Sequence, residues 1–273
     1  MEGLKVRPPA VAGMFYPADR EELEALINFV CGEPYTGEKI KAKAVLVPHA
    51  GYIYSGKTAC EVYKRIEIPE HVVILGPNHT GMGAPVSVYD GDAWETPFGI
   101  VEIDKEIRDR LLQFYGFEPD EEAHKFEHSL EVQLPFLQKF AERPFKITPI
   151  VLSLLRYEDA LYVARQMAKV LRDYADNVLI VISSDMSHYI PAEKAAELDR
   201  LAIECMEKLD TACLYERVFR YNISMCGVIP AVVGIEVAKA LGATKGILVD
   251  YTNSGQVTGD YKSVVAYAGM IFV

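Results

Sequence analysis

The sequence predicts an α/β fold, a three-layer α/β/α sandwich in which helices cover both faces of a mixed, mostly parallel central sheet. Short apolar runs typical of buried strands alternate with amphipathic stretches typical of helices. Residues 178–182 are apolar throughout, as in a central parallel strand. Extended runs within 82–103 and two apolar segments at the C-terminus indicate that the sheet is mixed.

The first half of the chain begins with an extended lead-in, because residues 7–18 are rich in proline and glycine. A helix is expected over 20–31, since Asp19 and Glu22 have the spacing of a capping box and apolar residues follow at helical intervals. The next expected elements are a strand ending near Val47, a helix over 56–66 capped by Ser55, a strand over 72–76, extended runs over 85–89 and 99–103 separated by a loop that carries Trp94, and a helix from Asp104 to about Tyr115.

The second half continues the alternation. A helical segment over 127–141 is expected to be interrupted at Pro135, because proline breaks the helical hydrogen-bond ladder. The further expected elements are strands over 147–152 and 178–182, helices over 157–174, 191–209, 211–220 and 227–241, and two closing strands over 245–251 and 263–273. Without a linker or low-complexity segment, residues 1–273 are expected to form one domain.

Composition excludes several classes of function. The formal charge of −11 argues against nucleic acid and against an anionic membrane surface as partners. Five cysteines without a Cys-x-x-Cys pair indicate a reduced, cytoplasmic chain. The N-terminus has no apolar signal core. The longest apolar run, 264–273, is half the length of a membrane-spanning helix and is expected to be a core strand.

Two histidines follow apolar runs that end in a proline: His49 comes after Pro48, and His79 after Gly76-Pro77-Asn78. Ligands of parallel α/β proteins bind beyond the carboxyl ends of the strands, so both imidazoles are expected in one site. Neutral imidazoles are good ligands for zinc, copper, iron or nickel. The competing interpretation is that each histidine merely caps a strand end with a hydrogen bond.

A hydroxyl-rich loop follows the most apolar strand and contains Asp185 and His188. An aspartate close to a histidine fixes its tautomer and raises its basicity, which suits general acid–base catalysis. The alternative is a capped turn before the next helix. Cys226 precedes an apolar helix, where a thiol has a lowered pKa and can serve as ligand or nucleophile. Alternatively it is an inert buried residue, as the other four cysteines are expected to be.

The segment Glu127-His128-Ser-Leu-Glu131 offers a further group. On a helix His124, His128 and Glu131 would share one face, as a metal triad or as substrate-binding residues. A solvated helix face explains the same spacing. A competing motif, Gly51 to Thr58, matches the phosphate-loop pattern and would make the protein a magnesium-dependent nucleotidase with Lys57 on the phosphates. Bulky residues at 52–54 disfavour it.

Taken together, these motifs resemble those of the Memo family from end to end. The matching segments are Arg7-Pro-Pro-Ala-Val-Ala-Gly-Met-Phe-Tyr-Pro17, Pro48-His-Ala-Gly-Tyr52 through Gly56, Gly76-Pro-Asn-His79, Glu127-His-Ser-Leu-Glu-Val-Gln-Leu-Pro135, Ser183-Ser-Asp185 to His188, Cys226-Gly227, and Tyr251-Thr-Asn-Ser-Gly255.

The resemblance implies a fold similar to the LigB-like class III extradiol dioxygenases, which bind non-haem iron. It places His49, His79 and Cys226 on the metal-ligand positions, and His188 on the acid–base position with Asp185 close by. Cysteine stands where the dioxygenases carry a carboxylate. A softer thiolate favours zinc, copper or redox-active iron and argues against ordinary catechol ring cleavage.

The expectation is therefore one metal ion, iron or copper in first place and zinc in second, in an oxidoreductase-like cleft lined by Tyr52, Asn78, Trp94, His128 and Glu131. The alternative is a cleft that binds a peptide or small anion without catalysis. Mammalian members of the family resemble binding proteins for phosphotyrosine peptides. Prokaryotic members often accompany a radical-SAM protein, which implies a shared pathway.

Overall fold

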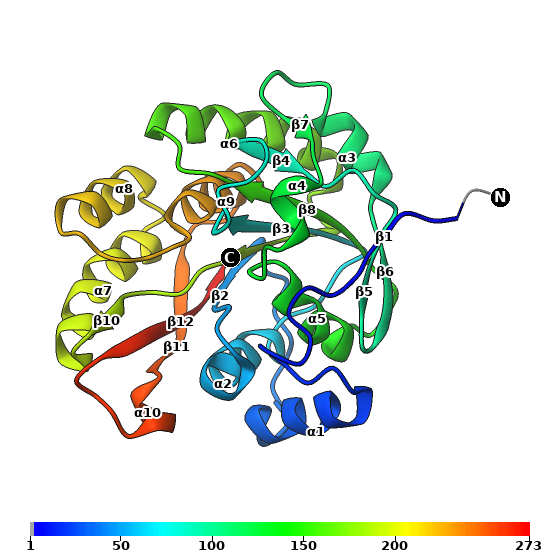
Figure 1. Cartoon of the computed structure of the whole chain (residues 1–273). Coiled ribbons are helices and arrows are strands. Elements are labelled where there is room, and N and C mark those ends of the chain that lie inside the picture. The colour runs from blue at the N-terminus through cyan, green and yellow to red at the C-terminus, as the bar shows by residue number, and fades with distance from the viewer. Residues whose placement is uncertain (1–2) are drawn as a thin grey trace.

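The computed structural model describes residues 3–273, which form two β-sheets with helices packed around them (Figure 1). Within these residues the main sheet has nine strands in the order β10-β12-β2-β9-β3-β8-β4-β7, and β11 also pairs with β12. A small sheet has the order β1-β5-β6. The strands are β1 Val6–Arg7, β2 Ala44–Val47, β3 His71–Pro77, β4 Val86–Val88, β5 Ala93–Thr96, β6 Gly99–Glu102, β7 Glu118–Pro119, β8 Lys146–Leu152, β9 Val178–Ser183, β10 His188–Ile190, β11 Gly246–Asn253 and β12 Val264–Phe272.

The helices fall between these strands, as the alternating pattern predicted. They are α1 Arg20–Cys31, α2 Tyr52–Tyr63, α3 Lys105–Leu111, α4 Glu122–Lys125, α5 Leu134–Phe140, α6 Tyr157–Leu171, α7 Ala192–Glu207, α8 Thr211–Arg220, α9 Val228–Ala240 and α10 Gly255–Thr258, with short 3₁₀ turns at Glu131–Gln133 and Arg172–Tyr174. Helix α1 has the predicted bounds, and the Asp19 side chain accepts a hydrogen bond from the Glu22 amide at 3.0 Å.

The centre of the main sheet is parallel, and antiparallel pairs flank it on both sides. Strand β9 lies between β2 and β3 and is parallel to both, and β8 is parallel to β3. Strands β12 and β4 pair antiparallel with β2 and β8. The sheet is therefore mixed, as predicted. This order brings the carboxyl ends of β2, β9 and β3 side by side, and that edge carries the candidate site.

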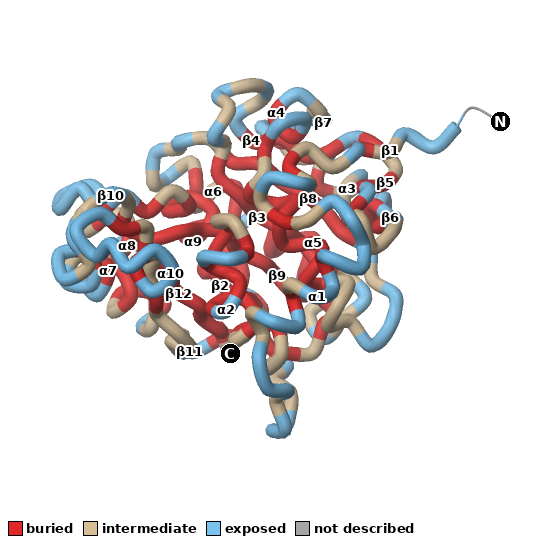
Figure 2. The backbone as a smooth tube through the Cα atoms, turned by 60° about the horizontal axis from the view of Figure 1, so that its bottom comes forward, coloured by how far each residue is buried: buried red, intermediate tan, exposed pale blue. Residues whose placement is uncertain are grey.

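Two apolar cores lie on opposite faces of the sheet, because successive strand residues point to opposite sides. In β2, Ala44 and Leu46 pack with α3, α6, α7, α8 and α9, whereas Val45 and Val47 pack with α1, α2 and α5. Figure 1 shows α1 and α2 together on one side of the sheet and α6, α8 and α9 on the other. Figure 2 shows that the strands and parts of the helices such as α9 are buried, whereas exposed residues lie in the loops and on the outer parts of the helices. The three-layer prediction is confirmed.

Several local predictions were wrong. Helix α2 begins at Tyr52 and not at residue 56, and the hydroxyl of Ser55 bonds to the Ala50 carbonyl instead of capping a helix start. The phosphate-loop interpretation is also wrong, because residues 52–56, which would have to wrap around a phosphate, lie in helix α2. Thr58 is buried and hydrogen-bonds to Thr252 at 2.7 Å.

Cysteine pairing also differs from the expectation of reduced thiols. Cys31 at the end of α1 forms a disulfide with Cys60 of α2, and Cys205 of α7 forms one with Cys213 of α8. Each bridge joins two neighbouring helices. Cys226 is a free thiol. In the described part of the chain, no helix is long and apolar enough to cross a membrane.

Candidate metal centre

The site lies at the carboxyl edge of the parallel strands. His49 is the second residue after β2, and His79 is the second residue after β3. Strand β9 lies between β2 and β3 and ends at Ser183, so its loop leaves the sheet between the two strands that deliver these histidines. The sequence predicts that the ends of parallel strands bring these two loops together. The observed strand order does so, because β2 and β3 are both parallel to β9.

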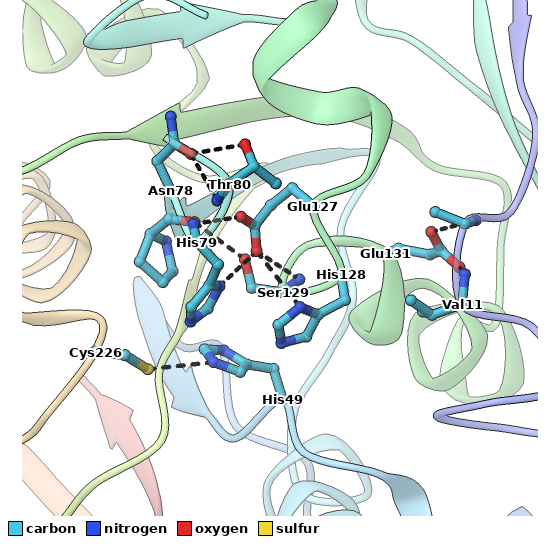
Figure 3. Close-up of polar contacts among 12 residues, drawn as sticks. Val11, His49, Asn78, His79, Thr80, Glu127, His128, Ser129, Glu131 and Cys226 are labelled. Carbon is cyan, nitrogen blue, oxygen red and sulfur yellow. Dashed lines mark hydrogen bonds and ion pairs between the residues drawn. The ribbon is translucent and has the colours of Figure 1, made fainter. Parts of the chain in front are cut away.

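Three imidazoles meet at this edge. The potential ligand atoms of His49, His79 and His128 all lie within 4.8 Å of one another. The His79 and His128 rings are stacked with centroids 4.6 Å apart, and both present faces or edges to His49 at 5.2–5.3 Å (Figure 3). His128 had been predicted to line the substrate pocket. The structure places its ring beside the two strand-end histidines.

The sulfur of Cys226 points toward the ring of His49 (Figure 3). Its sulfur is 3.2 Å from His49 Nε2 and accepts a hydrogen bond from the Asp185 amide at 3.3 Å. Gly227 makes this approach possible, because a Cβ there would lie 2.4 Å from Ser184 Cβ. Burial, with a smaller effect of the Asp185 charge, raises the pKa of the thiol well above its usual value. Without a cation the sulfur is therefore protonated.

His79 is held by a buried carboxylate. Glu127 Oε1 accepts from His79 Nδ1 at 2.7 Å, and Glu127 Oε2 accepts from the His79 amide at 2.6 Å. Burial lowers the pKa of His79, but the hydrogen bond and charge of Glu127 outweigh that effect and raise it. Burial opposes ionisation of Glu127, yet its bonds to His79 bring its pKa to about 2. Because Nδ1 donates to the carboxylate, Nε2 of His79 is free for a ligand.

His49 and His128 are kept neutral. Burial has the largest effect on the pKa of His49 and the charge of His79 the next largest, and together they lower it to about 3. His49 Nδ1 is hydrogen-bonded to the hydroxyl of Ser183 at 2.9 Å. Burial and the neighbouring imidazoles lower the pKa of His128 to about 4. The His128 ring also packs on Phe15, with centroids 4.5 Å apart. Neutral imidazoles are the form that binds metal ions.

Asp185 and His188 both belong to the site, but they are not paired as predicted. Asp185 Oδ1 accepts from the His49 amide at 2.8 Å. The ring of His188 donates from Nδ1 to the Ser224 carbonyl at 2.8 Å, so Ser224 and not Asp185 orients it. His188 lies close enough for its charge to lower the pKa of His49 and to act on that of Asp185. Its Nε2 is left available as a base.

Three residues expected to line the cleft have other surroundings. Tyr52 is buried against Phe136 and donates its hydroxyl hydrogen to the Val132 carbonyl. Trp94 lies in β5 of the small sheet, where the loop prediction was wrong, and Arg7 stacks over its ring at 4.3 Å. Glu131 is fully buried and accepts from Arg7 at 2.7 Å. These three side chains support the fold around the site.

Two further expectations concern Asn78 and the helical triad. Asn78 shapes the loop that carries His79: its Oδ1 accepts from the Thr80 and Gly81 amides, and its Nδ2 donates to the Met82 carbonyl at 2.7 Å. The triad of His124, His128 and Glu131 does not form, because α4 ends at Lys125 and the chain turns before Glu131.

The sequence motifs contained Glu127 and Ser183, but neither had been given a role at the metal position. Glu127 immediately precedes His128, and Ser183 ends the most apolar strand; no local signal connects them to His79 and His49. The site as a whole offers a cluster of three imidazoles, with one thiol that contacts His49. This donor set suits iron, copper or zinc better than magnesium or calcium, which prefer oxygen ligands.

The chain was compared with known proteins. The family model described as Memo-like protein matches residues 7–271. A MEMO1 family protein of Aquifex aeolicus is 64% identical over 99% of this chain and 100% of its own length. One from Methanopyrus kandleri is 42% identical over 97% of this chain and 98% of its own. The crystal structure of an uncharacterized protein from Escherichia coli K12 superposes with a TM-score of 0.53 at 12% identity, over 85% of this chain and all of that one. This last similarity shows the fold alone.

Proposed function

The chain belongs to the Memo family, and from this membership and the geometry of the site we propose that it binds one redox-active metal ion, iron or copper, and acts as a metal-dependent oxidoreductase. One observation carries the proposal: three imidazoles, two of them with Nδ1 already hydrogen-bonded, direct ring nitrogens into one space within 4.8 Å. Second-layer bonds of this kind are typical of metal-binding histidines.

The ligands proposed are Nε2 of His49 and Nε2 of His79, completed by the sulfur of Cys226. Cys226 lies 3.2 Å from His49 Nε2, close to the separation of two atoms that bind one cation. A bound cation would deprotonate the thiol despite its raised pKa, because its charge stabilises the thiolate. The ligand atom of His128 lies within 4.8 Å of those of His49 and His79, so His128 either joins the ligands or receives the substrate.

The metal would supply electron-transfer chemistry and polarise a bound substrate. His188 contributes a base: its Nδ1 is engaged by Ser224, so Nε2 can accept a proton from a substrate held beside the metal position. Asp185 holds the His49 amide and keeps a negative charge near the imidazoles. The substrate is a small molecule or a peptide side chain that reaches these groups.

Metal analysis of the purified protein tests the proposal. Protein reconstituted separately with Fe²⁺, Cu²⁺ and Zn²⁺ is expected to retain about one ion per chain. His49→Ala and Cys226→Ser should both lower the retained iron or copper. His71→Asn is the matched control, because His71 begins the same strand that delivers His79 at its other end. Unchanged metal content in His49→Ala refutes the proposed centre.

Two results separate ligands from neighbours. If Cys226 is a ligand, Cu²⁺ loading produces a thiolate charge-transfer band that disappears in Cys226→Ser, and the thiol becomes protected from alkylation. If His128 takes that place, His128→Asn loses the metal instead. Protein that binds none of the three ions, with a freely titratable thiol, would leave the cleft as a binding site for a peptide or anion.

A further inference from the structure

A buried hydrogen-bond network behind His49 connects it to Ser183, Gln133 and two backbone carbonyls. Gln133 is fully buried and lies in the 3₁₀ turn before α5. Its Nε2 is 2.9 Å from the Pro48 carbonyl and 2.9 Å from Ser183 Oγ. Ser183 Oγ is in turn 2.7 Å from the Ser129 carbonyl and 2.9 Å from His49 Nδ1. Sequence motifs assign no role to this group.

The two carbonyls fix the direction of every bond in the network. A carbonyl only accepts, so the Gln133 atom facing Pro48 must be the amide nitrogen, and its second hydrogen points to Ser183. The amide oxygen of Gln133 then accepts from the Tyr63 hydroxyl at 2.7 Å. This orientation follows from Pro48 alone and needs no choice between the two ends of the amide.

The same reasoning applies to the hydroxyl of Ser183. Its single hydrogen goes to the Ser129 carbonyl, because that carbonyl cannot donate. One of its lone pairs accepts from Gln133. The remaining lone pair faces His49 Nδ1, which must therefore carry the hydrogen.

From this we infer that Gln133 and Ser183 are positioning residues that lock His49 in the Nδ1–H tautomer, so that its Nε2 lone pair faces Cys226 and the space shared by the three imidazoles. The sulfur at 3.2 Å from Nε2 agrees with this assignment, because a protonated thiol can donate to that lone pair. The inference deepens the proposed function, on which its metal-binding consequence rests. The tautomer itself is a property of the metal-free protein.

Long-range proton–nitrogen spectra of metal-free protein with isotope-labelled histidine test the tautomer directly, and the His49→Asn variant assigns the signals. In the wild type His49 is expected to carry its hydrogen on Nδ1 alone. Ser183→Ala removes the acceptor and is expected to give a mixture of tautomers. Ser183→Thr keeps the hydroxyl and should restore the single tautomer. A wild-type His49 protonated at Nε2 overturns the inference, whatever the variants do.

Zn²⁺ binding provides the second readout. Ser183→Ala is expected to weaken Zn²⁺ affinity by about 10- to 100-fold, the usual effect of removing an outer partner of a histidine ligand. Ser187→Ala is the matched control: Ser187 is a fully buried serine of the same loop whose hydroxyl bonds to Asp199 at 2.6 Å. Equal losses in the two variants, or an unchanged tautomer in Ser183→Ala, overturn the positioning role. Wild-type protein with the expected tautomer that binds none of Zn²⁺, Fe²⁺ and Cu²⁺ refutes the metal centre and leaves the tautomer assignment standing.

Discussion

Replacing Glu131 by glutamine is expected to destabilise the fold strongly, because this buried carboxylate accepts hydrogen bonds from four donors. Oε2 accepts from Arg7 Nη1 at 2.7 Å and from the Ala10 amide at 2.8 Å. Oε1 accepts from the Val11 amide at 3.0 Å and from the Tyr16 hydroxyl at 2.7 Å. Arg7 and Glu131 side chains are 3% and 0% exposed, so water cannot replace either partner.

The magnitude follows from what glutamine leaves unpaired. Its oxygen can satisfy the donors on one side, but its amino group then faces the donors on the other. The Arg7 charge also loses its counter-ion, although it keeps bonds to the His124 and Glu127 carbonyls at 2.8 and 2.9 Å. Breaking a buried ion pair by removing one partner costs about 3–5 kcal/mol. We expect a loss of this size in the free energy of unfolding.

Urea unfolding followed by circular dichroism measures the loss. The control is Glu24→Gln, which breaks the ion pair of Glu24 with Lys139 at 3.0 Å; those side chains are 52% and 28% exposed. An exposed pair contributes less than about 1 kcal/mol. Limited proteolysis should also cut residues 7–18 faster in Glu131→Gln. Similar stability losses in the two variants would show that the buried pair does not hold the N-terminal segment.

Three further variants or conditions test the packing and electrostatics. Gly234→Ala should lower the free energy of unfolding in urea by about 1–3 kcal/mol, because a Cβ there would lie 2.4 Å from Ile182 and overpack the contact of α9 with β9. A variant as stable as the wild type, or more stable, would contradict that close contact. Burial lowers the pKa of His124 to about 3. The neutral imidazole therefore contributes stability that is complete above pH 6.5 and is lost as pH falls toward 3, at up to about 1.4 kcal/mol per pH unit. Urea midpoints of His124→Gln should fall less on acidification than those of the wild type. Removing the disulfide between Cys31 and Cys60 by a double alanine substitution should lower the free energy of unfolding, measured in urea without reductant, by about 3–4 kcal/mol, since the disulfide closes a long loop. A loss under about 1 kcal/mol would show that the disulfide does not constrain the unfolded chain.

The parts of the fold that sequence reasoning found are those set by local periodicity. The bounds of α1 and α8 follow from amphipathic spacing, and an aspartate caps each helix. His49 and His79 could be placed together because parallel strands end at one edge, a rule that holds whichever strands are neighbours. These predictions needed no knowledge of distant contacts.

The errors concern residues whose environment is decided by segments far away in the chain. Trp94 lies in a strand because β5 forms a hairpin with β6 and also pairs with the distant β1, which has only two residues and gives no periodic signal. Glu131 is separated by 124 residues from Arg7, so its spacing to His128 misled the prediction toward a shared helix face. Disulfide partners likewise come from different helices, and cysteine spacing cannot reveal them.

The burial of the site residues is uneven, and this determines from where a ligand can reach them. His49 and Asp185 are 2% and 4% exposed, whereas the side chains of His79 and His128 are 33% and 21% exposed. His49 therefore lies at the inner end of the group, Cys226 is partly exposed, and the stacked pair of His79 and His128 lies at the outer end. In the proposed function, a substrate would reach the imidazoles from the side of His79 and His128.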